Sequence, residues 1–142
     1  MTLPRVAVVT TGGTIDSMGV DRLDLAAYLD NATRMAPGEL LAGIAHELAT
    51  IADVHEVPFR RVRAHAMTDD DLAELVETVR YQFDRDEADG VVVTHGTNTL
   101  EETAWLLHLV HPVPHLGHPL PLPHQADAAI VITGAMRPAS EI

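Results

Sequence analysis

The segment GVVVTHGTNTLEETAWLL, residues 90–107, joins an apolar run to a helical pattern through a short loop of hydroxyl, glycine and amide residues. The apolar run is continuous rather than alternating, which is typical of a strand buried on both faces of a parallel sheet. Thr99 and Glu102 have the spacing of a capping box, so we predict that a helix begins here. A strand followed closely by a helix is the repeating unit of α/β folds.

The rest of the chain repeats this alternation. Further strands are predicted at residues 5–11, 51–59 and 128–133. One helix is predicted to begin at Thr68, which can cap it, and another helical pattern lies between the first two strands. The apolar residues at helical spacing are Leu40, Leu41, Ile44 and Leu48 in the earlier pattern and Leu72, Leu75, Val76, Val79 and Phe83 in the later one. The order β, α, β, α, β, α, β predicts an α/β fold with a doubly wound, mostly parallel sheet, like that of Rossmann or flavodoxin-like proteins.

Composition excludes several classes of protein. The chain has 142 residues, 46% of them hydrophobic, as expected of one globular domain. A net charge of −12 argues against binding to nucleic acid, because phosphate backbones are bound by Lys and Arg. All nine basic residues are arginine, so no lysine of this chain can act in catalysis, and the absence of cysteine excludes thiolate chemistry. With neither a signal peptide nor a long apolar run, we expect a soluble, unexported, cytoplasmic protein that does not bind membranes.

The segments that follow three of the predicted strands are rich in hydroxyl groups and glycine. Ligands of open α/β sheets bind at the carboxyl ends of the strands, so these segments are the candidate site. They are TTGGT at residues 10–14, THGTN at residues 94–98 and TGAMRP at residues 133–138.

The first segment is compatible with a phosphate-binding loop or with a hydroxyl nucleophile. It matches neither G-x-G-x-x-G nor a Walker loop, and the chain has no Walker lysine. Glycine allows close approach of a ligand and positive φ, so Gly13 can clear space for a substrate while the strand presents Thr14. A segment such as TTGGT is by itself more often a turn, and a segment such as THGTN is by itself more often a helix cap. The presence of both segments at strand ends of one sheet favours a catalytic site.

Three segments resemble the bacterial-type L-asparaginases, also called asparaginase/glutaminase-like amidohydrolases. TGGTI at residues 11–15 and VVVTHGTNTLEETAWLL at residues 91–107 are similar to the two family signatures, and ITGAMRP at residues 132–138 is similar to a third segment. The resemblance implies hydrolysis of the side-chain amide of L-asparagine, with L-glutamine as the second candidate substrate. It implies no cofactor and no metal.

The resemblance also implies roles for individual residues. Thr14 corresponds to the nucleophile that forms an acyl-enzyme, and Thr97 corresponds to the second catalytic threonine. Tyr28 corresponds to a tyrosine on a mobile lid, although a tyrosine that packs on the core is the alternative. Asp16 would hydrogen-bond the lid or stabilise a turn, two alternatives that the sequence leaves open.

The substrate-binding positions differ from the family pattern. Ala64 and His65 stand where the family has Ser followed by Gln or His, which hold the α-carboxylate and α-amino ends of the substrate. Asn98 stands where many members have an aspartate that pairs with the substrate ammonium. An amide oxygen still accepts a hydrogen bond but carries no charge. We therefore expect weaker or altered recognition of the free amino acid.

Family members are considerably longer than this chain. We expect residues 1–142 to be an incomplete N-terminal domain, a fragment or a prematurely ended product, without the C-terminal domain. The family's catalytic lysine lies beyond the matched segments, so the activity of this chain alone is in question. The alternative function is a catalytically silent α/β module that binds a small amino acid or a partner subunit. The full-length family forms homo-oligomers.

Five histidines lie in the proline-rich segment at residues 108–126. Helical spacing cannot continue through its prolines, so these side chains would have no fixed geometry as metal ligands. We expect a solvated surface loop. Its histidines are His108, His111, His115, His118 and His124.

Overall fold

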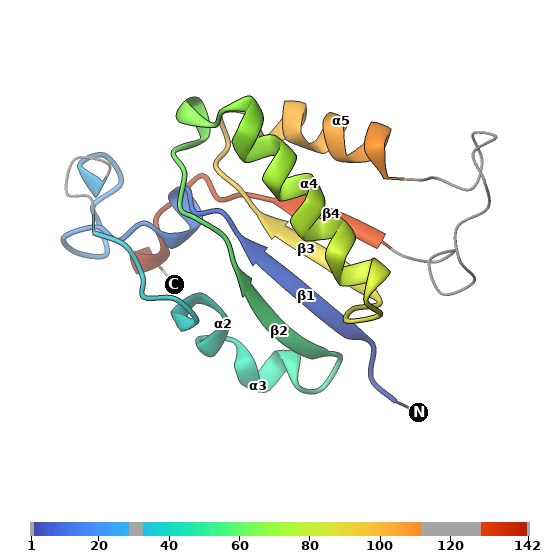
Figure 1. The fold of residues 1–142 in the computed structure, drawn as a ribbon. Coiled ribbons are helices and arrows are strands. Elements are labelled where there is room, and N and C mark those ends of the chain that lie inside the picture. Colours follow the sequence, from blue (N-terminus) through green and yellow to red (C-terminus); the bar gives the residue numbers. More distant parts are fainter. Residues whose placement is uncertain (1, 29–32, 112–128, 142) are drawn as a thin grey trace.

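The computed structural model describes residues 2–28, 33–111 and 129–141. Its centre is a four-stranded, fully parallel sheet in the order β2-β1-β3-β4 (Figure 1). The strands are β1 (Arg5–Thr10), β2 (Asp53–Pro58), β3 (Gly90–Thr94) and β4 (Ala129–Thr133). The predicted α/β fold with a parallel sheet is confirmed, and so are the four strands, to within a few residues at their ends.

Helices cover the sheet on both sides. α4 (Asp69–Asp84) and α5 (Leu100–Val110) pack on one face, while the short helices α2 (Glu39–Ala42) and α3 (Ala45–Leu48) lie along β2 (Figure 1). Successive residues of β2 face opposite sides of the sheet. His55 contacts Gln82 of α4, whereas Val54 lines a groove with α2 and α3. Short 3-10 helices follow β1, β2 and β4, namely η1 (Thr14–Asp16), η2 (Ala64–Ala66) and η4 (Ala139–Glu141).

The core lies between the sheet and the helices α4 and α5. Alternate residues of the two central strands point into it, which is the period-two pattern expected of a strand. Their partners are one apolar stripe of α4 and a leucine of α5. The most deeply buried members are Ala7, Val9, Leu75, Val79, Phe83, Val91, Val93 and Leu107.

The segment predicted as one helix before β2 forms two. α2 and α3 are separated at Gly43 and Ile44, and Ile44 has φ −125° and ψ 16°, outside the helical region. No residue of either helix is fully buried. The apolar spacing correctly predicted helical structure, but it could not show that the helix is interrupted at Ile44.

The start of α4 has the predicted capping geometry. The Oγ1 of Thr68 accepts a hydrogen bond from the backbone N–H of Asp71 at 3.2 Å, and the Asp71 carboxylate accepts one from the Thr68 N–H at 2.8 Å. Hydrogen bonds from the Thr68 hydroxyl and backbone, together with the nearby Arg60, lower the pKa of Asp71. The capping box predicted for α5 is wrong. Thr99 has φ −130° and ψ 23°, and its side chain makes no capping hydrogen bond.

We expect Thr68→Ala to lower the free energy of unfolding by about 1 kcal/mol, because a helix N–H loses its acceptor. Thr68→Ser keeps the hydroxyl and should remain close to the wild-type protein. Urea denaturation of the three proteins measures the difference. Equal midpoints for Thr68→Ala and Thr68→Ser would contradict the prediction.

His111, directly after α5, stacks against Phe83 with 5.1 Å between ring centroids. Burial lowers the pKa of His111 from its ordinary value near 6.5; Arg80 adds to this effect and Asp84 opposes it. As the pH falls, His111 is therefore protonated near pH 6.5 in the unfolded chain but only at a lower pH in the folded chain. Protonation of His111 leaves the free energy of unfolding unchanged well above pH 6.5 and lowers it as the pH falls below 6.5.

We therefore expect the free energy of unfolding to fall less steeply in His111→Gln than in the wild-type protein, between about pH 7.5 and about pH 5.5. Urea denaturation at both values tests this. His108→Gln, on the exposed side of the same helix, is the control for introducing glutamine. A His111→Gln slope as steep as the wild-type slope would contradict the assignment.

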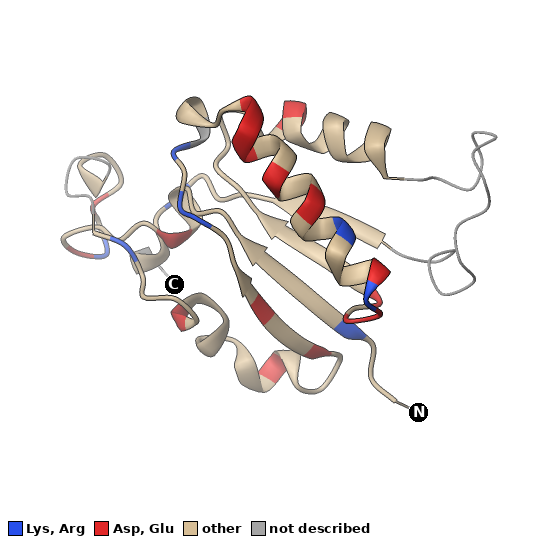
Figure 2. Cartoon of the chain, viewed as in Figure 1, with Lys and Arg blue, Asp and Glu red and all other residues tan. Residues whose placement is uncertain are grey.

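Charge is unevenly distributed over the fold. Acidic residues run along α4 in Figure 2.

Within the described ranges, no helix is long and apolar enough to cross a membrane. The surface-loop prediction for residues 108–126 is wrong at its start, because His108 lies in α5 and His111 is half-buried against Phe83. Residues 112–128, which include the other three histidines, lie outside the described part of the chain, so the prediction stays untested there.

Candidate functional site at the carboxyl edge of the sheet

The segments after β1, β3 and β4 lie beside one another, as expected for neighbouring parallel strands. Thr11 donates two hydrogen bonds to the Thr94 carbonyl, from its backbone N–H at 3.2 Å and from its hydroxyl at 2.9 Å. The N–H of His95 donates to the Thr133 carbonyl at 2.7 Å. These bonds extend the pairing of the strands by one residue and hold the three segments together.

Beyond this point two glycines bring the first and second segments into backbone contact. A Cβ atom on Gly13 would lie 2.7 Å from the Cα and 2.8 Å from the N of Gly96, closer than real Cβ atoms come to backbone. Gly13 also has φ 114°, a conformation that favours glycine. Thr14 and Thr97 directly follow these glycines, so the contact brings the two threonine-bearing segments together.

The third segment contacts the second in the same manner. A Cβ atom on Gly134 would lie 2.7 Å from the His95 carbonyl oxygen and 3.2 Å from Cγ2 of Thr97. Gly134 therefore allows β4 to end directly beside Thr97. The side chain of Thr97 is exposed, and that of Thr14 is partly buried.

His95 holds the second segment from inside. It is fully buried, and its Nδ1 lies 2.7 Å from the Gly96 carbonyl oxygen. A carbonyl only accepts hydrogen bonds, so Nδ1 donates, and in a neutral ring Nε2 then accepts from the Thr103 hydroxyl at 3.1 Å. Nε2 also lies 3.4 Å from Sδ of Met67. One imidazole thus links the loop after β3 to α5 and to the segment that carries η2.

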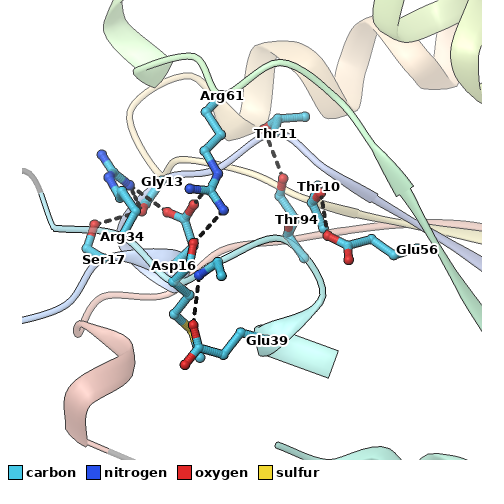
Figure 3. Close-up of polar contacts among 12 residues, drawn as sticks. Thr10, Thr11, Gly13, Asp16, Ser17, Arg34, Glu39, Glu56, Arg61 and Thr94 are labelled. Carbon is cyan, nitrogen blue, oxygen red and sulfur yellow. Dashed lines mark hydrogen bonds and ion pairs between the residues drawn. The ribbon is translucent and has the colours of Figure 1, made fainter. Parts of the chain in front are cut away.

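A buried carboxylate organises the segment after β1 (Figure 3). Asp16 is 6% exposed and binds two arginines, Arg34 at 2.6 Å and Arg61 at 3.3 Å. Arg34 also donates to the Gly13 carbonyl, which accepts a second hydrogen bond from the Ser17 hydroxyl at 2.8 Å. Asp16 therefore stabilises the turn after β1, one of the two predicted alternatives, and joins this turn to Arg34. Its predicted contact with a lid stays a prediction.

The predicted site residues are distributed as follows. Gly13, Thr14, Thr97 and Asn98 lie on the two segments in backbone contact, and Asn98 is exposed. No hydrogen bond joins Tyr28 to Thr14 or Thr97 in the described ranges, and Tyr28 lies half-buried on the long segment between Ser17 and Arg34.

Ala64 and His65 lie in η2, after β2, and His65 is exposed. The sheet therefore brings together the two threonines and Asn98, and it contributes η2 from the neighbouring strand. The described residues hold no group of three or more metal-ligating His, Asp or Glu side chains.

Sequence reasoning missed His95, Arg34 and Arg61. The signal for His95 was its place between a buried strand and the glycine of HGT, where a side chain must point inward. The arginines had a weaker signal. A buried aspartate after TGGTI requires cations, and only the fold shows which arginines reach it.

A family model described as "Asparaginase, N-terminal" matches residues 5–142. The chain belongs to the asparaginase family. Relatives include the glutaminase-asparaginase of Pseudomonas aeruginosa, 36% identical over 136 residues, which are 96% of this chain and 33% of the relative. The probable periplasmic L-asparaginase of Haemophilus influenzae is 30% identical over 139 residues, 98% of this chain and 34% of the relative.

Among solved structures, the probable cytoplasmic L-asparaginase of Campylobacter jejuni matches with a TM-score of 0.77 and 26% identity. The match covers 98% of this chain and 37% of that one. The chain therefore spans about a third of the length of the curated asparaginases that it matches.

Proposed function

We propose that the site hydrolyses the side-chain amide of L-asparagine to L-aspartate and ammonia, with L-glutamine as the second candidate substrate. The observation that carries this proposal is the backbone contact between Gly13 and Gly96, which brings a threonine on each segment to one edge of the sheet. Relatives named glutaminase-asparaginase and L-asparaginase support the choice of substrate.

In the proposed reaction the Thr14 hydroxyl attacks the amide carbon and loses its proton to a base. The tetrahedral intermediate expels ammonia after its nitrogen is protonated, and a threonine ester of the substrate remains. Water then attacks the ester, releases the new carboxylate and restores the hydroxyl. Thr97 assists in activating Thr14 or the water, and backbone N–H groups at the edge stabilise the oxyanion.

The remaining site residues have proposed roles in binding. In the proposal the backbone of Gly13 borders the substrate, and Ala64, His65 and Asn98 bind its α-carboxylate and α-amino ends. Tyr28 belongs to a segment that closes over the substrate and excludes water. Because Ala64 has no hydroxyl and Asn98 has no charge, the proposal includes weaker binding of the free amino acid.

A second candidate is a silent module of the same fold that binds an amino acid or a partner subunit without turnover. It is favoured because, among the described residues, the Thr14 hydroxyl has no hydrogen bond to a base. Within the described ranges no hydrogen bond joins Thr14 to Thr97, and the chain contains no lysine.

Ammonia release from L-asparagine and L-glutamine, measured together with calorimetry of L-aspartate binding, separates the two functions. Ammonia release that requires Thr14 supports the hydrolase. Aspartate binding without any release of ammonia supports the silent module and contradicts the hydrolase.

The proposal places the chain in the cytoplasm as the N-terminal domain of a homo-oligomeric enzyme. Fractionation of cells and light scattering test compartment and assembly.

A further inference from the structure

The segment that follows Thr14 is closed at its base by short backbone pairing. Ser17 and Arg34 form an isolated antiparallel bridge. On either side of it, the Met18 N–H donates to the Thr33 carbonyl at 2.9 Å and the Met35 N–H donates to the Asp16 carbonyl at 2.9 Å. The bridge fixes the backbone of Arg34 beside Ser17, which is three residues after Thr14, although Arg34 lies twenty residues after Thr14 in the chain.

The side chain of Arg34 is directed from this bridge toward Gly13 and Asp16 (Figure 3). Its Nη1 donates to the Gly13 carbonyl and to Oδ1 of Asp16. Asp16 is buried and its other oxygen binds Arg61, so the carboxylate is itself held from two sides. Charged hydrogen bonds of this kind are shorter and stronger than neutral ones.

We propose that Arg34 is a positioning residue for Thr14, because it holds the Gly13 carbonyl and thereby fixes the orientation of the peptide that carries the nucleophile. The inference rests on the proposed function of Thr14. The peptide is planar, so any rotation of the Gly13 carbonyl also moves the N–H of Thr14 and changes the φ angle of Thr14.

Gly13 has no side chain that could hold the orientation of this peptide. Its φ of 114° lies in a region that glycine, unlike other residues, readily adopts. The carbonyl is instead held from outside by Arg34 and by the Ser17 hydroxyl. A guanidinium on the carbonyl also polarises the peptide, which strengthens its N–H as a donor on the opposite side.

The chain offers a matched control for the loss of an arginine beside a buried carboxylate. Arg60 binds Asp71 at 2.8 Å, and the Asp71 side chain is 9% exposed, the same as that of Asp16. This second pair lies at the start of α4 and touches neither glycine segment in the contacts of the described residues. Arg60→Met therefore removes an arginine from a carboxylate buried to the same degree, together with the ion pair of Arg60 with Glu74, without releasing the Gly13 carbonyl.

The first test is steady-state hydrolysis of L-asparagine by the whole chain. Arg34→Met should lower kcat by about 100-fold, the effect of misplacing a reacting group by about 1 Å, while KM stays within about threefold. Arg34→Lys, which keeps one charged donor, should recover part of kcat, and Arg60→Met should leave it unchanged. An Arg34→Met kcat equal to that of Arg60→Met, at equal folded fraction by circular dichroism, would overturn the inference.

The second test does not depend on turnover and applies equally if the wild-type chain releases no ammonia, a result that would contradict the proposed function alone. Hydrogen–deuterium exchange in Arg34→Met should be at least about tenfold faster over residues 13–18 than in the wild-type chain, and unchanged over residues 69–84. Arg60→Met should show the reverse. Unchanged exchange at residues 13–18 in Arg34→Met would refute the positioning role.

Discussion

Thr14→Ala is expected to lower the rate of ammonia release from L-asparagine by about 10³-fold or more, because the acyl-enzyme cannot form without the hydroxyl. The side chain is only partly buried, and its segment is held through Gly13, Ser17 and Asp16 rather than through the threonine hydroxyl. The variant should therefore fold like the wild-type protein. A coupled assay for ammonia, with circular dichroism for folding, measures both quantities.

Two further variants make this result specific. Thr50→Ala removes an exposed threonine hydroxyl after α3, where it donates to the Glu47 carbonyl, and should leave the rate unchanged. Thr14→Ser keeps a hydroxyl and should retain more activity than Thr14→Ala. Ammonia release that survives in Thr14→Ala would contradict the assignment of the nucleophile.

Gly13→Ala is expected to cost roughly 2 to 5 kcal/mol of folding free energy, a large part of the stability of an ordinary domain. Two independent effects add. The new Cβ would lie 2.7 Å from backbone of Gly96, which has no flexible end to move aside, and φ 114° is strained for alanine. Urea denaturation measures the loss, and the same variant should release no ammonia.

Gly43→Ala is the control for adding a methyl group to a glycine. Gly43 has φ −63° and ψ −24°, and its nearest neighbour to a new Cβ is 3.8 Å away. Alanine is therefore expected to stabilise the protein by about 0.5 to 1 kcal/mol. A Gly13→Ala protein as stable as the wild-type protein would show that the two backbones are not in contact.

Much of the fold was predictable because its signals are local. The apolar runs at residues 5–10 and 90–94 are long enough to identify buried strands, and Thr68 with Asp71 marks the start of α4. Thr99 carried a similar sequence signal but has a different backbone conformation, which a three-residue spacing does not determine. The break between α2 and α3 was missed because the spacing of apolar residues likewise does not determine the backbone conformation of Ile44.

The candidate site was predictable only in part. Thr14 and Thr97 could be placed at this edge because each follows a strand, and parallel strands end at a common edge. The contact of Gly13 with Gly96 could be anticipated only as a need for small residues. The pairing of Asp16 with Arg34 and Arg61 depends on how distant segments return to the edge, and no local pattern specifies that.

The contact between Gly13 and Gly96 also separates the geometry of this edge from its chemistry. The two segments are placed by backbone atoms of Gly13 and Gly96, and the side chains of the neighbouring Thr14 and Thr97 take no part in this contact. A serine or cysteine at either position would be delivered to the same point on the sheet. With such an arrangement, selection or design can replace the reactive side chain without changing the backbone contact that positions it.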